Sequence, residues 1–137
     1  SEPSNQPLKV IEMTPQPIGV VVLYPGISAE IIKNQLQQPV KAMILQSYGV
    51  GNAPQDDALL TSLKEGINQG ITILNCTQCF RGRVNMDGYA TGNALAEIGI
   101  VSGANMTIEA ALTKFITCVR NTIRVYISCR WLSGWCW

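Results

Sequence analysis

Histidine is missing from this chain of 137 residues, and charged residues make up only 14% of it. The missing imidazole excludes Ser-His-Asp and Cys-His catalysis and removes the commonest zinc and haem ligand. A net charge of +1 gives no basic surface that would attract nucleic acid or an anionic membrane. No apolar run approaches the roughly 20 residues that span a bilayer. We therefore expect no metal, no cofactor, no nucleic-acid partner and no membrane partner.

Two further deficits bear on the compartment. The five cysteines form an odd set, with three of them in the last twenty residues, which is a poor basis for a disulfide framework. The chain opens with Ser1-Glu2-Pro3-Ser4 and lacks the basic and apolar regions of a signal peptide. Both features predict a reducing, cytoplasmic location.

Apolar residues are plentiful, at 47% of the chain, and they fall into short runs separated by glycine and proline. The pattern predicts strands over residues 18–24, 42–48 and 71–76, and helices over 28–38, 54–68, about 91–96 and from a cap at Asn105 onward. Strands that alternate with helices over short connections predict a small three-layer α/β domain. Its parallel sheet of three to four strands would be flanked by helices, as in flavodoxin-like or Rossmann-like folds. Such sheets carry their functional loops at the carboxyl ends of the strands.

The composition divides the chain into three regions. Residues 1–16 are rich in proline, glutamine and serine and predict a linker or an edge segment. The α/β pattern occupies residues 17–114. Residues 115–137 hold all three tryptophans, three arginines and no acidic residue. One interpretation of this tail is a terminal segment that packs on the domain or binds a partner; the other is a shift of reading frame.

Three motifs leave alternatives open. The segment 49–54 (Gly-Val-Gly-Asn-Ala-Pro) lies between a strand and a helix, and it suits a tight turn or a site for a small carboxylated ligand better than a dinucleotide site. Cys76 and Cys79 form a CxxC pair, but no helix clearly follows, so a core and a loop cysteine are favoured over a redox pair. Arg81 and Arg83 suit an exposed loop better than an anion site. No nucleophile is paired with an evident base.

An ordered series of motifs extends through most of the chain. They are Tyr24–Ser28 (YPGIS), Ser47–Pro54 (SYGVGNAP), Thr77–Cys79 (TQC), Val84–Met86 (VNM), Gly88–Ala96 (GYATGNALA) and Met106–Lys114 (MTIEAALTK). This series closely resembles bacterial cytoplasmic type I L-asparaginases, and the match runs continuously from about residue 17 to residue 114. The covered region resembles the smaller, C-terminal domain of that family.

The resemblance implies a chemistry that this chain does not carry by itself. In the family a threonine hydroxyl attacks the side-chain amide of asparagine, ammonia leaves, and water releases aspartate. The nucleophile follows a Gly-Gly turn, and a Thr-Asp-Lys assembly assists it, both in the N-terminal domain. Neither motif occurs here, so no catalytic residue can be assigned. The resemblance therefore implies a partner, the missing N-terminal catalytic domain, and L-asparagine as the substrate of the full enzyme.

The resemblance also implies an effector site. Some type I enzymes bind a second asparagine in the C-terminal domain, and the matching positions here are Gln46, Asn52, Thr77 and Cys79. The family member with this allosteric site has arginine where this chain has Gln46. Glutamine cannot form a charge-assisted bidentate pair with a carboxylate. We therefore predict weakened or absent effector binding.

The family is oligomeric, and its C-terminal domains contribute to the subunit interface. By resemblance, the segment Tyr89 to Asn93 is the candidate contributor, with Tyr89, Thr91 and Asn93 as its larger side chains. A homo-oligomer is the corresponding expectation.

The resemblance ends after Lys114. Residues 115–123 can be encoded so that a neighbouring frame gives His-Tyr-Leu-Cys-Gln-Glu-Tyr-Asp, which is close to the family sequence at this point. This supports the frame-shift interpretation of the tail. Two other classes of function remain alternatives to the asparaginase domain: a free-standing α/β module that binds a small ligand, and a redox protein that uses Cys76 and Cys79.

Overall fold

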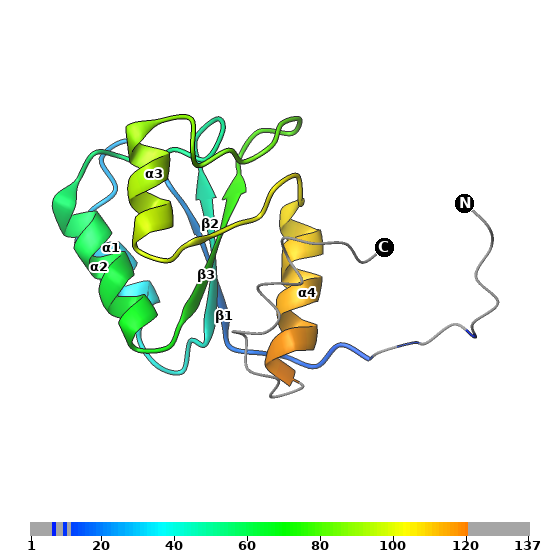
Figure 1. The fold of residues 1–137 in the computed structure, drawn as a ribbon. Helices are drawn as coiled ribbons and strands as arrows, with labels where there is room; N and C mark the ends of the chain where they lie inside the picture. Colours follow the sequence, from blue (N-terminus) through cyan, green and yellow to red (C-terminus); the bar gives the residue numbers. More distant parts are fainter. Residues whose placement is uncertain (1–6, 8–9, 11, 121–137) are drawn as a thin grey trace.

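The computed structural model describes Pro7, Val10 and residues 12–120 of the chain. In chain order the elements are β1 (Ile18–Val22), α1 (Ala29–Gln35), β2 (Ala42–Ser47), α2 (Asp57–Asn68), β3 (Thr72–Thr77), α3 (Ala90–Glu97), β4 (Val101–Ser102) and α4 (Ile108–Arg120). The predicted α/β fold is confirmed. Four strands pair in the order β1-β2-β3-β4, every pair is parallel, and helices lie on both faces of the sheet (Figure 1).

Each face of the sheet has its own apolar core. Helices α1, α2 and α3 cover one face and α4 covers the other (Figure 1). Successive side chains of a strand point to opposite faces, so Met43 and Leu45 enter the first core while Ala42 and Ile44 enter the second. This explains why β2 and β3 are mostly apolar runs in the sequence, because both of their faces are buried, whereas Val20 and Val22 of β1 are exposed.

Helices α1, α2 and α4 begin at side-chain caps, and two of these caps differ from the predicted positions. The predicted Ser28 cap is confirmed, because its Oγ accepts the Ile31 N–H at 3.4 Å. The second helix was expected from Pro54, but α2 begins at Asp57. The Asp56 carboxylate caps it by accepting N–H groups of the first turn. Asp56 is therefore the N-cap of α2.

The last helix also begins later than predicted. Thr107, not Asn105, supplies the capping oxygen, since its Oγ1 accepts the Ala110 N–H at 3.3 Å and α4 begins at Ile108. The first helix is shorter than the predicted 28–38 range; Ile32 and Leu36 are buried, whereas Ile31 is 42% exposed. Residues 115–120 of the predicted tail continue α4, whereas residues 121–137 lie outside the described residues.

Among the described residues, no helix combines the length and the apolar composition that crossing a membrane would require. The same residues contain no group of three histidine, cysteine or carboxylate side chains able to hold a metal ion.

Candidate functional site

The loops after β2 and β3 meet at the carboxyl-terminal edge of the sheet (Figure 1). The β2 loop is a tight turn in which the Tyr48 N–H donates to Asn52 O at 2.8 Å and the Asn52 N–H donates to Tyr48 O at 2.9 Å. Gly51 has φ 113°, a value that side chains rarely adopt. A Cβ there would also approach Val84 Cγ1 to 2.8 Å. The glycine is needed because the turn packs directly against the β3 loop.

The start of α2 is already occupied by the protein's own carboxylate. The Asp56 side chain accepts the N–H groups of Ala58 (2.9 Å) and Leu59 (3.3 Å). Asp57 adds a second negative charge in the first turn. A phosphate or carboxylate ligand at this helix end would have to displace one carboxylate and approach another. The glycine motif thus forms a tight turn, and the helix end beside it is capped by the protein's own carboxylate.

Gln46 lies at the end of β2, and the alternation along that strand puts its side chain on the α4 face of the sheet. The residue is half-buried, and its side-chain amide makes no hydrogen bond to the described residues. Its backbone oxygen accepts the Leu23 N–H at 2.9 Å and Nε2 of Gln78 at 2.9 Å. The amide at this position is thus unpartnered in the described part of the chain, at the edge where the loops meet.

Thr77 and Cys79 are brought together directly. Thr77 Oγ1 donates to Gly49 O at 2.5 Å and accepts the Cys79 N–H at 3.0 Å. These two bonds fix the first residues of the β3 loop against the β2 turn. Cys79 itself is exposed. Thr77 pairs in register with Ser47, the residue after Gln46, so its side chain lies on the opposite face of the sheet from the glutamine amide.

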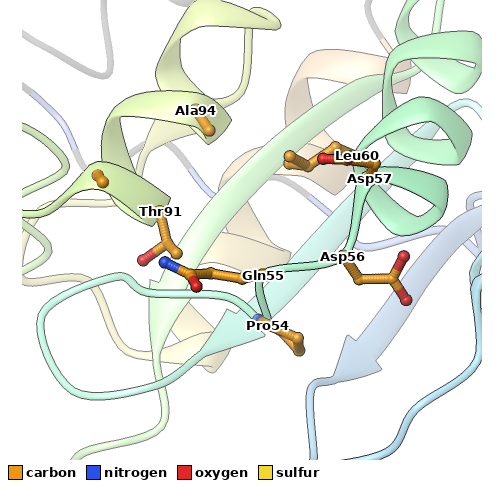
Figure 2. A pocket seen from close by; sticks show the side chains of 8 residues that line it. Pro54, Gln55, Asp56, Asp57, Leu60, Thr91 and Ala94 are labelled. Atoms are coloured by element: carbon orange, nitrogen blue, oxygen red, sulfur yellow. The ribbon is translucent and has the colours of Figure 1, made fainter.

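Asn52 is joined to α3 rather than to the other three predicted effector residues. Its Oδ1 accepts the Thr91 Oγ1 hydrogen at 3.1 Å. Beside this pair is a pocket of about 290 Å³. It is lined by Pro54, Gln55, Asp56, Asp57, Leu60, Ala90, Thr91 and Ala94. Figure 2 shows Gln55 and Thr91 directed towards the same space from the two sides of this pocket.

Of the predicted interface residues, Tyr89 is 60% exposed and Asn93 is also exposed.

A buried amide that sequence reasoning did not single out organises this edge of the sheet. Asn75 is fully buried, and its Oδ1 accepts the Ser47 hydroxyl at 2.5 Å. Its Nδ2 donates to Gly51 O at 3.0 Å and lies 3.3 Å from Met86 Sδ. One side chain therefore ties β2, the β2 turn and the β3 loop together. A polar residue inside an apolar strand was the available signal, because buried amides are retained where they are fully hydrogen-bonded.

Gln78 was also missed. Its Nε2 donates to Leu23 O at 2.7 Å and to Gln46 O at 2.9 Å, so it joins the ends of β1 and β2 to the β3 loop. Its partner Leu23, just after β1, is 55 positions away in the sequence, and no local pattern predicts such a contact.

The CxxC pair is split between two environments. Cys76 is buried in the core beneath α4, and burial raises the pKa of its thiol to about 11. A redox cysteine needs the opposite shift, because the thiolate is the reactive form. The structure therefore favours the core-residue interpretation of Cys76 over the redox alternative.

This difference predicts selective thiol labelling. At pH 8 only about one in a thousand Cys76 side chains would be ionised, given a pKa of about 11. We expect a maleimide to modify Cys79 within minutes and to leave Cys76 unmodified in the folded protein. Peptide mapping by mass spectrometry separates the two sites, and labelling in urea gives the fully reactive control. Equal rates at both cysteines in native buffer would contradict the buried placement.

The hydroxyl groups at this edge are not arranged as nucleophiles. Ser47 donates to the Asn75 amide oxygen, Thr77 to a backbone oxygen and Thr91 to the Asn52 amide oxygen. None of these acceptors can remove the proton, as activation would require. The fold and the site thus define a class: a small parallel α/β domain with a polar loop cluster in which the hydroxyl groups of Ser47, Thr77 and Thr91 are not activated.

The comparisons place the chain within that class. The Glutaminase/Asparaginase C-terminal domain family matches residues 17–125, so the chain belongs to this family. It is 63% identical over 107 residues to L-asparaginase 1 of Escherichia coli K12, covering 78% of this chain and 32% of that protein. It is 46% identical over 97 residues to a 60 kDa lysophospholipase of Mus musculus, with 71% and 17% covered. The chain therefore spans about a third, or less, of the length of these relatives.

A solved structure agrees in fold. L-asparaginase I from Vibrio cholerae superposes with a TM-score of 0.85 at 49% identity, over 90% of this chain and 37% of that one. The predicted resemblance to the C-terminal domain of L-asparaginases is confirmed.

Proposed function

We propose that this chain is the structural and regulatory C-terminal domain of an L-asparaginase, inactive alone, and that the hydrolysis of L-asparagine to L-aspartate and ammonia requires an N-terminal catalytic domain. The observation that carries the proposal is the 63% identity to about a third of an L-asparaginase. The site supports it, because the hydroxyl groups of Ser47, Thr77 and Thr91 donate to amide or backbone oxygens rather than to a base. A cytoplasmic location and a homo-oligomer with contacts at Tyr89, Thr91 and Asn93 belong to the same proposal.

Ammonia release tests the catalytic part. The chain alone is expected to give no turnover of asparagine. Added N-terminal domain of the E. coli relative should produce turnover that saturates with the amount of this chain. The control is the N-terminal domain alone. Asparagine turnover by the purified chain, retained after a second purification and proportional to its concentration, would contradict the assignment of catalysis to the other domain.

Regulation is the finer part of the proposal. An effector asparagine would contact Gln46, Asn52, Thr77 and Cys79. The unpartnered amide of Gln46 supports a contact there, but an amide offers the effector carboxylate only a neutral hydrogen bond. Weak or absent binding is therefore expected for the natural sequence.

Replacing Gln46 by arginine tests whether the missing guanidinium weakens effector binding. Gln46→Arg should tighten asparagine binding about tenfold or more, because a charge-assisted bond contributes about 1.5–3 kcal/mol. Titration calorimetry on the two full-length chains measures the change. Gln46→Lys is the matched control, since it carries the charge without the planar fork and should recover less. The idea fails if arginine brings no gain.

The origin of residues 115–137 is a separate proposal. A single-base slip near Phe115 would explain why a neighbouring frame resembles the family sequence. Sequencing the coding DNA across this point tests it. An uninterrupted frame confirmed in independent clones would refute the slip.

A further inference from the structure

One aspartate of the chain is followed by glycine. The aspartates are Asp56, Asp57 and Asp87, and Asp87-Gly88 is the only aspartate–glycine or asparagine–glycine pair in the sequence. Glycine has no Cβ, so its amide nitrogen can approach the side chain of the preceding residue more closely than that of any other residue. At this pair, therefore, a side-chain carboxyl and a backbone nitrogen can react with each other most readily.

The structure leaves both reacting groups of this pair available. Asp87 and Gly88 are exposed and lie in a turn and a bend, outside any helix or strand. Among the described residues, the Asp87 carboxylate has no hydrogen-bond or ion-pair partner, and no acceptor takes the Gly88 N–H. The Asp87 N–H donates to Asn85 Oδ1 at 3.3 Å, a contact that uses the backbone of Asp87 and not its side chain.

The other two aspartates are held differently. The Asp56 carboxylate accepts the N–H groups of Ala58 at 2.9 Å and Leu59 at 3.3 Å. The Ala58 nitrogen is the one that would attack the Asp57 carboxyl, and its hydrogen bond and its place in α2 oppose that attack. The fold therefore protects Asp57 and leaves Asp87 open, which makes Asp57 an internal control.

We propose that Asp87 is a site of age-dependent isomerisation, which converts the Asp87–Gly88 peptide link into an isoaspartyl link and thereby loosens the start of α3. The Gly88 nitrogen forms a bond to Asp87 Cγ, and the hydroxyl of the protonated carboxyl leaves with the amide proton as water. Water then opens the resulting cyclic imide at the Asp87 backbone carbonyl carbon. This breaks the bond from that carbon to the Gly88 nitrogen and leaves the chain running through Cγ. Water is the only co-reactant, and the mass is unchanged.

The new link would lie between two fixed points. Met86 is buried, and α3 lies directly against it, since a Cβ on Gly92 would come within 2.8 Å of Met86 O. Helix α3 begins at Ala90, at the carboxyl-terminal edge of the sheet (Figure 1), and its Thr91 Oγ1 donates to Asn52 Oδ1 at 3.1 Å. Isoaspartate adds a carbon atom to the main chain and makes the former backbone carboxyl a side branch. The short connection would then no longer fit both points. The proposal is independent of the asparaginase assignment.

Peptide mapping of the folded chain tests the site. The full-length protein and a peptide of residues 84–90 are kept in warm neutral buffer for weeks, and electron-transfer fragmentation distinguishes isoaspartate from aspartate. Because an exposed loop changes conformation at little cost in free energy, isomerisation of Asp87 in the protein should be no more than about tenfold slower than in the peptide. Asp57 should stay unchanged. A slower reaction than that at Asp87, or equal amounts of isoaspartate at Asp57, would overturn the proposal.

Two variants separate the chemistry from folding. A Cβ on Gly88 would make only ordinary contacts, the nearest at 3.6 Å to Asn85 Nδ2, so Gly88→Ala should keep the fold. The added Cβ hinders the attack and should slow isomerisation at least about tenfold. Asp87→Glu keeps the charge but would have to form a larger ring, so it should give no detectable isomer. Equal rates in the natural chain and in Gly88→Ala would overturn the proposed route.

Hydrogen exchange tests the effect on α3. Hydrophobic-interaction chromatography separates the isoaspartyl form from the aspartyl form. The amides of α3 should exchange at least about tenfold faster in the isoaspartyl form, because a helix that has lost its anchor opens more often. Those of α1, on the same face of the sheet, should be unchanged. Equal exchange of α3 in the two forms would overturn the proposed loosening of the helix.

Discussion

Replacing Asn75 by leucine is expected to lower the free energy of unfolding by about 2 kcal/mol or more, because a buried carbonyl oxygen loses its donor, at a cost of about 1–3 kcal/mol, and a buried hydroxyl loses its shorter hydrogen bond. The Gly51 carbonyl oxygen is the first of these groups, and the Ser47 hydroxyl, which keeps only the Cys76 carbonyl oxygen at 3.3 Å, is the second. Leucine has the same branching as asparagine, but its methyl groups are larger than the amide oxygen and nitrogen, so overpacking adds to the loss of hydrogen bonds. Urea unfolding followed by far-UV circular dichroism measures it. Tryptophan fluorescence is unsuitable, because all tryptophans lie in the tail.

The control for this change is a surface amide. Asn34 is exposed on α1, and Asn34→Leu should alter the free energy of unfolding by no more than about 0.5 kcal/mol. Ser47→Ala completes a cycle with Asn75→Leu. Because the two side chains share one hydrogen bond, the double variant should lose less than the sum of the single losses. A cost of Asn75→Leu close to that of Asn34→Leu would show that the amide is not what holds this edge together.

Asn75→Asp gives the same network a pH dependence. The carboxylate would be fully buried and would face the Gly51 carbonyl oxygen, so desolvation and repulsion should raise its pKa in the folded state. The folded variant then binds more protons than the unfolded chain. Its stability relative to the natural protein should therefore fall as the pH rises above the unfolded aspartate pKa of about 3.9, and level off above the raised folded value. Urea midpoints at pH 4 and pH 7 would reveal the change. An equal difference from the natural protein at both pH values would contradict it.

The strands were predictable because burial on both faces produces continuous apolar runs, but helix ends and β4 were not. Val101–Ser102 is too short to show any periodicity. Asp56 and Thr107 are caps whose positions depend on the local turn, and the sequence offered neighbouring residues of the same type, such as Asp57 and Asn105. Boundaries therefore depended on backbone geometry that composition does not encode.

The candidate site was predictable only in part. The contact between Thr77 and Cys79 is local and follows from their spacing of two residues. Asn52 was expected beside those two residues, whereas its side chain accepts a hydrogen bond from Thr91, 39 positions away. Gln78 and Asn75 act through contacts that form only when the strands are in register. The fold class predicts that polar loops meet at the carboxyl edge of the parallel sheet. Which residues contact one another there depends on long-range contacts that the sequence pattern does not show.

Gly103→Ala is expected to destabilise the fold by about 3 kcal/mol through steric overlap and the loss of one hydrogen bond. A Cβ on Gly103 would lie 2.8 Å from Asn75 O and 2.8 Å from Cys76 Sγ. The Gly103 N–H also donates to Asn75 O at 2.8 Å, so the added carbon would push apart the two groups that hold β4 to β3. Neither can move freely, because one is backbone and the other is a buried side chain.

Gly70→Ala is the control, because it introduces backbone strain without steric overlap. Gly70 follows α2 with φ 93°, and a Cβ there would meet nothing within 4 Å. Its cost should be about 1 kcal/mol, the strain of a left-handed backbone alone.

The reactivity of Cys76 distinguishes the two variants, because its thiol faces Gly103. Maleimide labelling of Cys76 should become at least about tenfold faster in Gly103→Ala, as β4 separates from β3 more often, and stay unchanged in Gly70→Ala. If both variants lost the same stability and left Cys76 protected, the close approach of Gly103 to β3 would not be what holds β4 in the sheet.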